Sequence, residues 1–286
     1  MSGWQKVYDQ LMIVPTILVF DSGLGGLTVY GEIAALRPQA HYFYLADDAV
    51  FPYGALPAEA LVERVNGLMD HWIAVLKPDI VVIACNTAST LVLPHLRARH
   101  PHVPFVGTVP AIKPAALQSR SHMISVLATP ATVARDYTHD LIREHAAHCE
   151  VQLVGAPNLA SLAERVMHGE KVNDADIFAE IALCFVERNG KRTDHIVLAC
   201  THYPLLLAHV QRLAPWPVQW VDPAPAIARR VDHVLNQTGF VQAGFAQEEV
   251  PGIGRQASGR ALFTSDKVQE AVLIAALAQI GLKVGP

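Results

Sequence analysis

Two cysteines, each at the end of a short apolar segment, are the residues of this sequence best suited to chemistry. Cys85 follows residues 80–84, an apolar run rich in β-branched side chains, and Cys200 follows a similar run at residues 196–199. Such runs are typical of strands buried on both faces of a parallel sheet, and the carboxyl ends of such strands commonly carry functional sites. The sequence therefore predicts two matched thiols, each at the tip of a buried strand.

Two thiols facing each other across a small cleft suit the inversion of a carbon stereocentre. One thiolate removes a proton from the carbon, and the other thiol returns a proton to the opposite face. An ordinary thiol has a pKa of ~8.5, and a helix N-terminus stabilises a nearby negative charge by only ~0.3–1 kcal/mol. Because one pKa unit corresponds to ~1.4 kcal/mol, each thiolate needs a further neighbour. His202 is the candidate neighbour for Cys200, and Asp21, which ends the first expected strand, is the candidate for Cys85.

Small polar residues accompany both cysteines and could bind a carboxylate substrate. Helix N-termini bind carboxylates well, and several small donors are expected around the same cleft. These donors are Ser22, Asn86, Thr87, Ser89 and Thr201. The glycine-rich turn at residues 21–26 lacks the Lys-Ser/Thr ending of a phosphate loop. By themselves, Asp21 and Ser22 could equally cap the next helix, and His202 could be a structural hydrogen-bonding group.

An internal repeat sets the expected architecture. The interval from Cys85 to Cys200 recurs between residues 103–106 and 218–221, and again between residues 110–112 and 225–227. A shared interval at three places predicts two halves with the same topology. We therefore expect an α/β fold of two pseudo-symmetric parallel-sheet lobes, with the active site in the cleft between them. The first lobe would hold residues 13–109 plus 222–286, the second lobe residues 110–221, and residues 1–12 would be an N-terminal extension.

Hydrophobic patterning and turn residues locate the elements that must position these side chains. Strands are expected at residues 16–20, 41–46, 80–84, 103–106, 124–128, 151–154, 195–199, 218–221 and 261–263. Helices are expected at residues 27–36, 57–76, 86–99, 112–117, 133–145, 161–167, 173–189, 222–235 and 267–280, and a loop at residues 241–259.

The composition indicates a well-buried enzyme and argues against several other classes. The chain of 286 residues is 51% hydrophobic and 17% charged, and its formal net charge is -4. Its basic residues are scattered, which disfavours nucleic-acid binding, and no apolar run approaches the ~18 residues of a membrane helix. The N-terminus lacks the pattern of a secretory signal. Four cysteines without framework spacing favour free thiols in a reducing cytoplasm, with Cys149 and Cys184 structural.

Six motifs resemble those of the cofactor-independent glutamate racemases of bacterial wall synthesis. They are V-F-D-S-G-L-G-G-L-T-V (19–29), F-P-Y-G (51–54), A-C-N-T-A-S (84–89), V-G-T-V-P-A-I-K-P-A (106–115), L-A-T-P-A-T-V (127–133) and L-A-C-T-H-Y-P-L-L (198–206). The resemblance implies interconversion of L- and D-glutamate for peptidoglycan synthesis, without pyridoxal phosphate or a metal. It also implies that Cys85 deprotonates the D-isomer and Cys200 the L-isomer.

The resemblance further implies roles for neighbouring residues. Catalysis would be assisted by Asp21, His202 and Glu164. Substrate contacts map onto Asp21, Ser22, Tyr53, Gly54, Asn86, Thr87, Thr201 and His202. Residues 131–139 and the N-terminal extension resemble members activated by the wall precursor UDP-N-acetylmuramoyl-L-alanine, so we expect that molecule as an activator. We expect a cytoplasmic enzyme that needs no nucleic acid or membrane, and we favour a monomer.

Three alternatives remain compatible with the sequence. The first is a racemase of the same superfamily with another substrate, such as aspartate. The second is a metalloenzyme in which Cys85, Cys200 and His202 form a Cys₂His zinc site. The third is a two-lobe protein that binds an amino acid without turning it over, although this reading gives no reason for two matched thiols.

Overall fold

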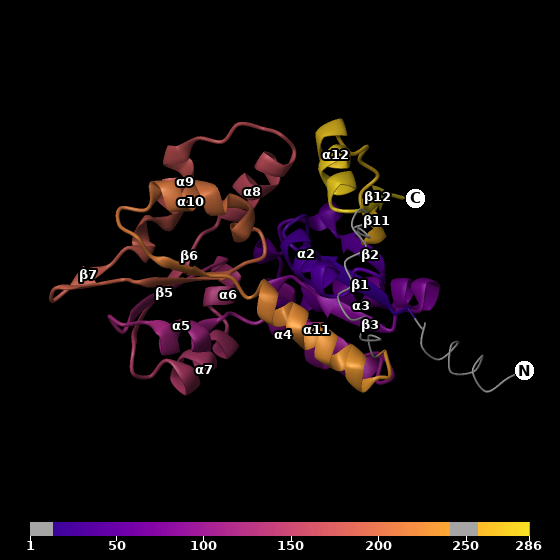
Figure 1. Ribbon diagram of the computed structural model, residues 1–286, viewed down its shortest axis with the longest axis horizontal. Coiled ribbons are helices and arrows are strands. Elements are labelled where there is room, and N and C mark those ends of the chain that lie inside the picture. The colour runs from indigo at the N-terminus through magenta and orange to yellow at the C-terminus, as the bar shows by residue number, and fades with distance from the viewer. Residues whose placement is uncertain (1–13, 241–256, 286) are drawn as a thin grey trace, which may run out of the picture.

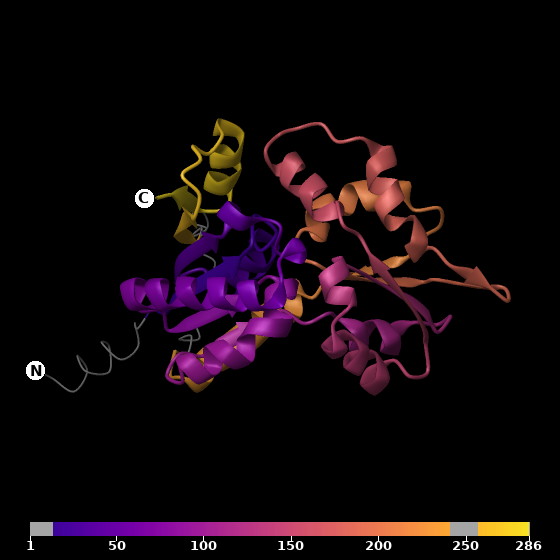
Figure 2. The same ribbon diagram turned by 180° about the vertical axis from the view of Figure 1, so that it is seen from behind.

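The computed structural model describes residues 14–240 and 257–285, which form two bodies side by side (Figures 1 and 2). Its strands are β1 (Thr16–Asp21), β2 (His41–Ala46), β3 (Ile80–Ile83), β4 (Phe105–Gly107), β5 (Met123–Ala128), β6 (Glu150–Gly155), β7 (Glu187–Arg188), β8 (Lys191–Arg192), β9 (His195–Ala199), β10 (Gln219–Val221), β11 (Ser258–Phe263) and β12 (Leu282–Val284).

Helices lie between most of these strands. The α-helices are α2 (Leu27–Leu36), α3 (Ala58–Leu76), α4 (Asn86–Arg99), α5 (Ile112–Gln118), α6 (Pro130–Val133), α7 (Asp136–His145), α8 (Leu159–Met167), α9 (Asp174–Ile181), α10 (Leu207–Leu213), α11 (Ala224–Gln237) and α12 (Ala271–Gln279). Short 3₁₀ turns are η1 (Asp48–Val50), η2 (Tyr53–Ala55), η3 (Ala182–Cys184) and η4 (Tyr203–Leu206).

Two parallel sheets organise the molecule, and their strand orders repeat. One sheet runs β12-β11-β2-β1-β3-β4 and the other β10-β9-β5-β6. The order β2-β1-β3-β4 in the first sheet corresponds to the order β6-β5-β9-β10 in the second. In each set, the strands that stand side by side are the second, first, third and fourth of the set along the chain, and all these neighbours are parallel. The strand before Cys85 (β3) therefore occupies the same place as the strand before Cys200 (β9). The predicted two-lobe parallel α/β architecture is confirmed, whereas the residue limits of the lobes stay a prediction.

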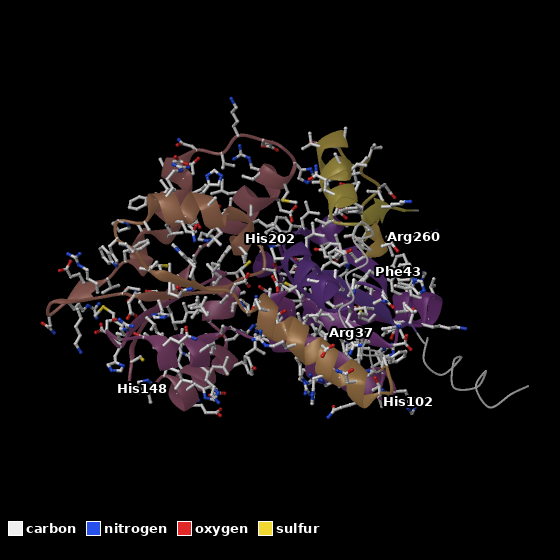
Figure 3. All side chains as sticks on the ribbon, in the orientation of Figure 1. Arg37, Phe43, His102, His148, His202 and Arg260 are labelled. Atoms are coloured by element: carbon white, nitrogen blue, oxygen red, sulfur yellow. The ribbon has the colours of Figure 1, made fainter. Side chains whose placement is uncertain are left out.

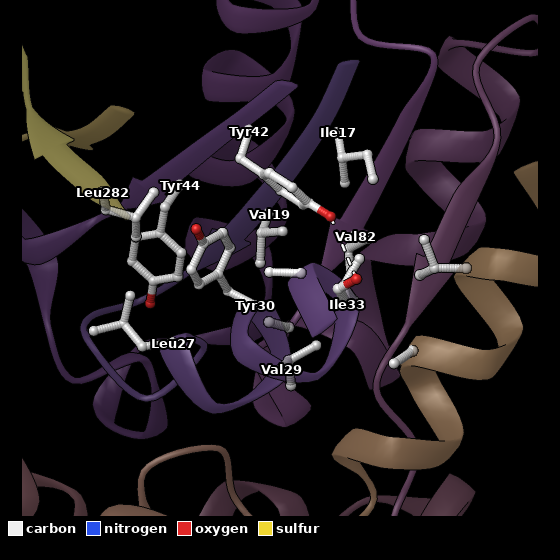
Figure 4. Packing of buried hydrophobic residues seen from close by; sticks show 14 of the residues in the cluster. Ile17, Val19, Leu27, Val29, Tyr30, Ile33, Tyr42, Tyr44, Val82 and Leu282 are labelled. Atoms are coloured by element: carbon white, nitrogen blue, oxygen red, sulfur yellow. Dashed lines mark hydrogen bonds between the residues drawn. The ribbon is translucent and has the colours of Figure 1, made fainter. Parts of the chain in front are cut away.

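The first sheet is held by a core in which tyrosines are prominent (Figure 4). Tyr30 packs edge-on against Tyr42, with ring centroids 5.1 Å apart. The buried Tyr42 hydroxyl donates to the carbonyl of Arg37 (2.8 Å), so burial of this ring leaves no polar group unsatisfied. This packing fixes β2 against α2, which begins directly after the glycine-rich turn of the site.

The chain returns to the first lobe after β10. Helix α11 packs on α2, and the side chain of Arg37 pairs with Asp232 (2.6 Å) and reaches Asn236 (2.6 Å). Strand β11 then pairs with β2. A late segment of the sequence thus completes the lobe that the first segment began.

Two expected helices were wrong in their extent. The helix expected at residues 133–145 begins later, at Asp136, and a separate short helix, α6, precedes it and ends at Val133. Thr129 caps the start of α6 by accepting from the Thr132 amide (3.2 Å). The helix expected at residues 173–189 ends at Ile181, and the chain enters the β7–β8 hairpin. Asn189 and Gly190 turn that hairpin with φ of 51° and 74°. Asn-Gly is the sequence signal for such a turn.

The C-terminal region also differs from expectation. Strand β11 begins at Ser258, inside the expected loop 241–259, and β12 was not expected. Helix α12 begins at Ala271 rather than at residue 267. The rest of that loop, residues 241–256, and the predicted N-terminal extension lie outside the described residues. Within the described part of the chain, no helix has both the length and the apolarity to cross a membrane.

Candidate active site

The two predicted thiols lie at equivalent strand ends, one in each lobe. Cys85 follows β3 and stands at the N-cap of α4, and Cys200 follows β9 just before η4. Both side chains are almost fully buried, 5% and 6% exposed. Burial raises the pKa of the Cys85 thiol above its ordinary value, and the nearby groups Asp21 and Cys200 raise it further. The Cys85 thiol therefore loses its proton less readily than an ordinary thiol.

Asp21 organises the glycine-rich turn and links the lobes. Its fully buried carboxylate accepts hydrogen bonds from the amides of Ser22 (2.7 Å) and Gly26 and from the hydroxyl of Thr201 in the other lobe (3.1 Å). Burial raises the pKa of Asp21, although the positive charge of His202 opposes this. Cys85 meets Ser22 instead, with Oγ and Sγ 3.7 Å apart. Ser22 is thus its direct polar neighbour, and Asp21 acts on it through charge.

Cys200, His202 and Glu164 form a hydrogen-bonded chain at the junction of the lobes, where His202 lies in Figure 3. Nδ1 of His202 is 3.8 Å from Sγ of Cys200, and Nε2 is 2.7 Å from Oε1 of Glu164 on α8. Burial opposes a charge on His202, but its hydrogen bonds to Cys200 and Glu164, together with the negative charges of these groups, raise its pKa well above the ordinary value. His202 can therefore take the thiol proton of Cys200 while Glu164 stabilises the resulting imidazolium.

The glycine-rich turn approaches this chain so closely that side chains would not fit. The Leu24 amide donates to Glu164 (2.5 Å). A Cβ atom added to Gly25 would lie 2.6 Å from the backbone nitrogen of His202, and one added to Gly23 would overlap Glu164 Oε1. These positions need glycine because backbone from one lobe lies against the catalytic candidates of the other.

Asn86 presents a free amide group inside the site. Its side chain is 2% exposed, and neither its nitrogen nor its oxygen has a hydrogen-bond partner among the described residues. Buried polar groups are nearly always hydrogen-bonded in native proteins, so this amide indicates a place for a polar ligand. By contrast, Ser89 donates to the Ile83 carbonyl (2.7 Å) and accepts from the Thr108 amide (3.0 Å), which commits it to the backbone.

Thr87 forms a further contact between the lobes. Its hydroxyl lies 3.0 Å from that of Thr129 and 3.3 Å from that of Thr132, both on the far lobe. Sequence reasoning did not single out Thr129 and Thr132 as site residues. The signal was present, because Thr129 follows β5 directly, at the same sheet edge as Cys200.

Of the expected substrate contacts Tyr53 and Gly54, only Gly54 lies at the contact between the lobes. The buried Tyr53 hydroxyl donates to Asp47, which also pairs with Arg64 (2.6 Å). Burial and the charge of Asp47 raise the pKa of Tyr53, which keeps it a neutral phenol. Gly54 lies beside Thr129, since a Cβ atom there would be 3.5 Å from that side chain. Gly54 thus lies where the two lobes meet, whereas the Tyr53 hydroxyl is already hydrogen-bonded to Asp47.

A cavity of about 320 Å³ lies next to this chain of residues. Gly23, Leu24, Phe51, Glu164 and His168 contribute to its wall. Cys85, Cys200 and His202 are not among the described side chains whose ligand atoms gather closely enough to hold a metal ion. The buried amide of Asn86 and the glycine-rich turn remain the candidate contacts for a small polar molecule.

Comparison with known proteins gives one consistent family. A family model for Asp/Glu/hydantoin racemases matches residues 31–231. The glutamate racemases of Brucella canis and Brucella anthropi are each 58% identical over 219 residues, which is 77% of this chain and 79% of theirs.

Solved structures agree with these relatives. A crystal structure of Escherichia coli glutamate racemase in complex with L-glutamate and the activator UDP-MurNAc-Ala is 35% identical, with a TM-score of 0.81 over 95% of this chain and 97% of that one. Glutamate racemase from Aquifex pyrophilus is 25% identical, with a TM-score of 0.63 over 95% and 96%. Because relatives and family model each cover most of its length, the chain belongs to the glutamate racemases of the Asp/Glu/hydantoin racemase family.

Proposed function

We propose that this racemase interconverts L- and D-glutamate with Cys85 and Cys200 as its two bases. The observation that supports this most strongly is a pair of buried thiols at equivalent strand ends of two lobes, beside the buried free amide of Asn86. The Cys85 thiolate takes the α-proton of D-glutamate, and the Cys200 thiol donates its proton to the opposite face of the carbanion. The products are L-glutamate, a Cys85 thiol and a Cys200 thiolate, and the reverse reaction starts from that state.

Substrate binding would bring a positive charge that the surroundings of Cys85 lack. Burial and Asp21 both oppose the Cys85 thiolate in the free protein. The ammonium group of glutamate, placed beside Asp21, would neutralise that carboxylate and stabilise the thiolate. We therefore assign Asp21, Ser22 and Thr201 to the ammonium group of the substrate. We assign Asn86, Thr87 and the backbone at Gly54 to its two carboxylates.

Exchange of the α-proton tests the proposal directly. Incubation of pure L-glutamate with the enzyme in deuterated water should give D-glutamate with deuterium at Cα, since the returned proton comes from a thiol that exchanges with solvent. L-Aspartate assayed in parallel should react much more slowly. Binding of glutamate without deuterium incorporation would instead support a non-catalytic binding protein, and faster reaction of aspartate would support an aspartate racemase.

Asn86→Ala should weaken substrate binding. A hydrogen bond to a charged group is worth ~1.5–3 kcal/mol, so KM for glutamate should rise by ~10- to 100-fold with a smaller change in kcat. Asn66 on α3 is a matched control, because its buried side-chain oxygen also has no hydrogen-bond partner among the described residues, yet it lies in a groove away from the cysteines. Equal effects of Asn66→Ala and Asn86→Ala on KM would count against this assignment.

His202→Ala should affect deprotonation by Cys200 more than deprotonation by Cys85. Because enantiomers have equal free energy, kcat/KM must be the same in both directions, so the asymmetry has to be measured otherwise. Loss of the proton acceptor raises the barrier for abstraction from L-glutamate, by ~10²-fold or more in rate. The primary deuterium isotope effect should therefore increase for L-[2-²H]glutamate and change less for the D-isomer. An equal increase for both isomers would disprove a specific pairing of His202 with Cys200.

We also propose activation by UDP-N-acetylmuramoyl-L-alanine, the activator present in the Escherichia coli structure. A second cavity of about 340 Å³ offers Arg97, Arg230 and Tyr137, which suit a diphosphate and a base ring. Arg97 lies near the end of α4, and the same helix begins at Asn86 beside Cys85. Binding of the activator near the carboxyl end of α4 can therefore shift Asn86 and Cys85 at the other end of the same helix.

Arg97→Ala tests this activator site. The variant should keep its basal racemisation rate and lose most of its stimulation by the precursor. Arg120→Ala, an exposed arginine in the second lobe, serves as the control and should be stimulated normally. Unchanged stimulation in Arg97→Ala would place the activator elsewhere.

The biological setting follows from the chemistry. Supply of D-glutamate to peptidoglycan synthesis is the proposed role. We propose a cytoplasmic location, because a site of two thiols works only while both sulfurs stay reduced. We propose no resident cofactor and favour a monomer.

A further inference from the structure

Three metal-ligating side chains gather at the far end of the second lobe. His122, His148 and Cys149 each offer a ligand atom, and these atoms lie within 4.8 Å of one another. Figure 3 places His148 at the outer edge of the lobe, well away from His202. Both histidines are exposed and Cys149 is half-buried, so the cluster can be reached from solvent. None of these residues has a part in the proposed reaction.

The sheet register builds this cluster. His122 and Cys149 immediately precede β5 and β6, which pair in parallel from Met123 and Glu150 onward. The Glu150 amide donates to the His122 carbonyl (2.7 Å), which holds the two strand entrances side by side. The His122 and His148 rings meet edge-on, with centroids 5.6 Å apart. Three ligands are thus held on the rigid end of a sheet and not on a long loop.

A buried carbonyl beneath the cluster orients it further. His148 Nε2 lies 3.2 Å from the carbonyl oxygen of Ala116, and Cys149 Sγ lies 3.9 Å from the same oxygen. A neutral imidazole that donates from Nε2 keeps the lone pair of Nδ1 free. Metal-ligating histidines commonly donate their second ring N–H to a carbonyl in this way.

We propose that His122, His148 and Cys149 form a binding site for a thiophilic divalent metal ion of the Zn²⁺ class. Two imidazoles and one thiolate are ligands that such ions prefer, and the absence of a carboxylate among the three disfavours Mg²⁺ and Ca²⁺. Binding displaces the Cys149 thiol proton to solvent, and water fills the fourth position. The ion would link the amino ends of β5 and β6. Cys200 lies at the opposite end of the same sheet, after the carboxyl end of β9.

Titration of the reduced full-length protein with Zn²⁺ and, as a spectroscopic probe, Co²⁺ tests the site. We expect one equivalent of Co²⁺ to give thiolate-to-cobalt charge-transfer absorption that Zn²⁺ abolishes. Cys149→Ser should remove this absorption, and His148→Ala should weaken binding by at least ~100-fold, because even outer-shell changes cost 10- to 100-fold. His139→Ala, which removes an exposed histidine of α7, should bind like the wild type.

Assays of racemase activity distinguish metal binding at this site from metal binding at the active-site thiols. One equivalent of Zn²⁺ should leave activity essentially unchanged, and the metal-free Cys149→Ser and His148→Ala variants should be fully active. Lack of saturable binding would overturn the proposal. So would binding that persists in both variants and inhibits racemisation, since the ion would then lie at Cys85 and Cys200.

Discussion

Replacement of either Cys85 or Cys200 by alanine should reduce racemisation by at least ~10³-fold, within the range that a positioned acid or base contributes. In the proposed mechanism each sulfur serves one face of the α-carbon. Without one sulfur, the site could not start the reaction in one direction and could not complete it in the other. Both side chains are almost buried at strand ends, and alanine fits there without new polar groups. Racemisation is measured by the loss of optical rotation of L- and of D-glutamate.

Cys149→Ala is the matched control, because it removes a thiol from the same fold outside the cleft. It should racemise glutamate at the wild-type rate. Circular dichroism spectra and melting temperatures of all three variants should show that each one folds. More than a trace of turnover in Cys85→Ala or Cys200→Ala would refute the assignment of two cysteine bases.

Gly25→Ala should cost at least ~10²-fold in kcat/KM, although Gly25 supplies no reacting group. The added Cβ would lie 2.6 Å from the backbone nitrogen and 2.7 Å from Cγ of His202, and a backbone atom cannot rotate away as a flexible side chain can. The glycine-rich turn and the second lobe must separate, which moves Cys200 and His202 away from Cys85 and Asp21 on the first lobe. A displacement of about 1 Å at a catalytic group can cost ~10²-fold in rate.

Gly31→Ala provides the contrast within the same segment. Gly31 lies on the exposed face of α2, and a Cβ atom there meets nothing within 4 Å. This variant should keep full activity, and its free energy of unfolding, measured with denaturant, should increase by ~0.5–1 kcal/mol because alanine favours a helix. Wild-type activity in Gly25→Ala would show that the lobes do not need this close approach.

The repeated fold gives the two sulfurs equivalent positions but different surroundings. Cys200 has His202 and Glu164, whereas Cys85 has the Ser22 hydroxyl and the opposing charge of Asp21. The substrate and product are mirror images, yet the protein groups that serve them are not. The two half-reactions are therefore expected to differ in which barrier limits the rate, as the His202→Ala isotope experiment would reveal.

The sequence alone was enough to predict the two sheets and the strand ends that carry the cysteines. Burial of a whole strand leaves a local signature, an unbroken apolar run, and residues 80–84 and 196–199 both carry it. The shared interval between the halves then implied equal topology, which the matching strand orders confirm. Asn189-Gly190 is a hairpin signal in the sequence, and the helix expected at residues 173–189 was wrong because that helix ends at Ile181, before the hairpin.

The tertiary structure decided which side chains meet. Glu164 lies on a helix distant in sequence from His202, and Thr129 meets Thr87 only because the lobes face each other. The Tyr53 hydroxyl is turned toward Asp47, and the Asn86 amide is left for a ligand. Strand formation depends on residues a few positions apart, so a sequence reports it. Contacts across the cleft depend on how the two lobes pack against each other, and no local pattern encodes that packing.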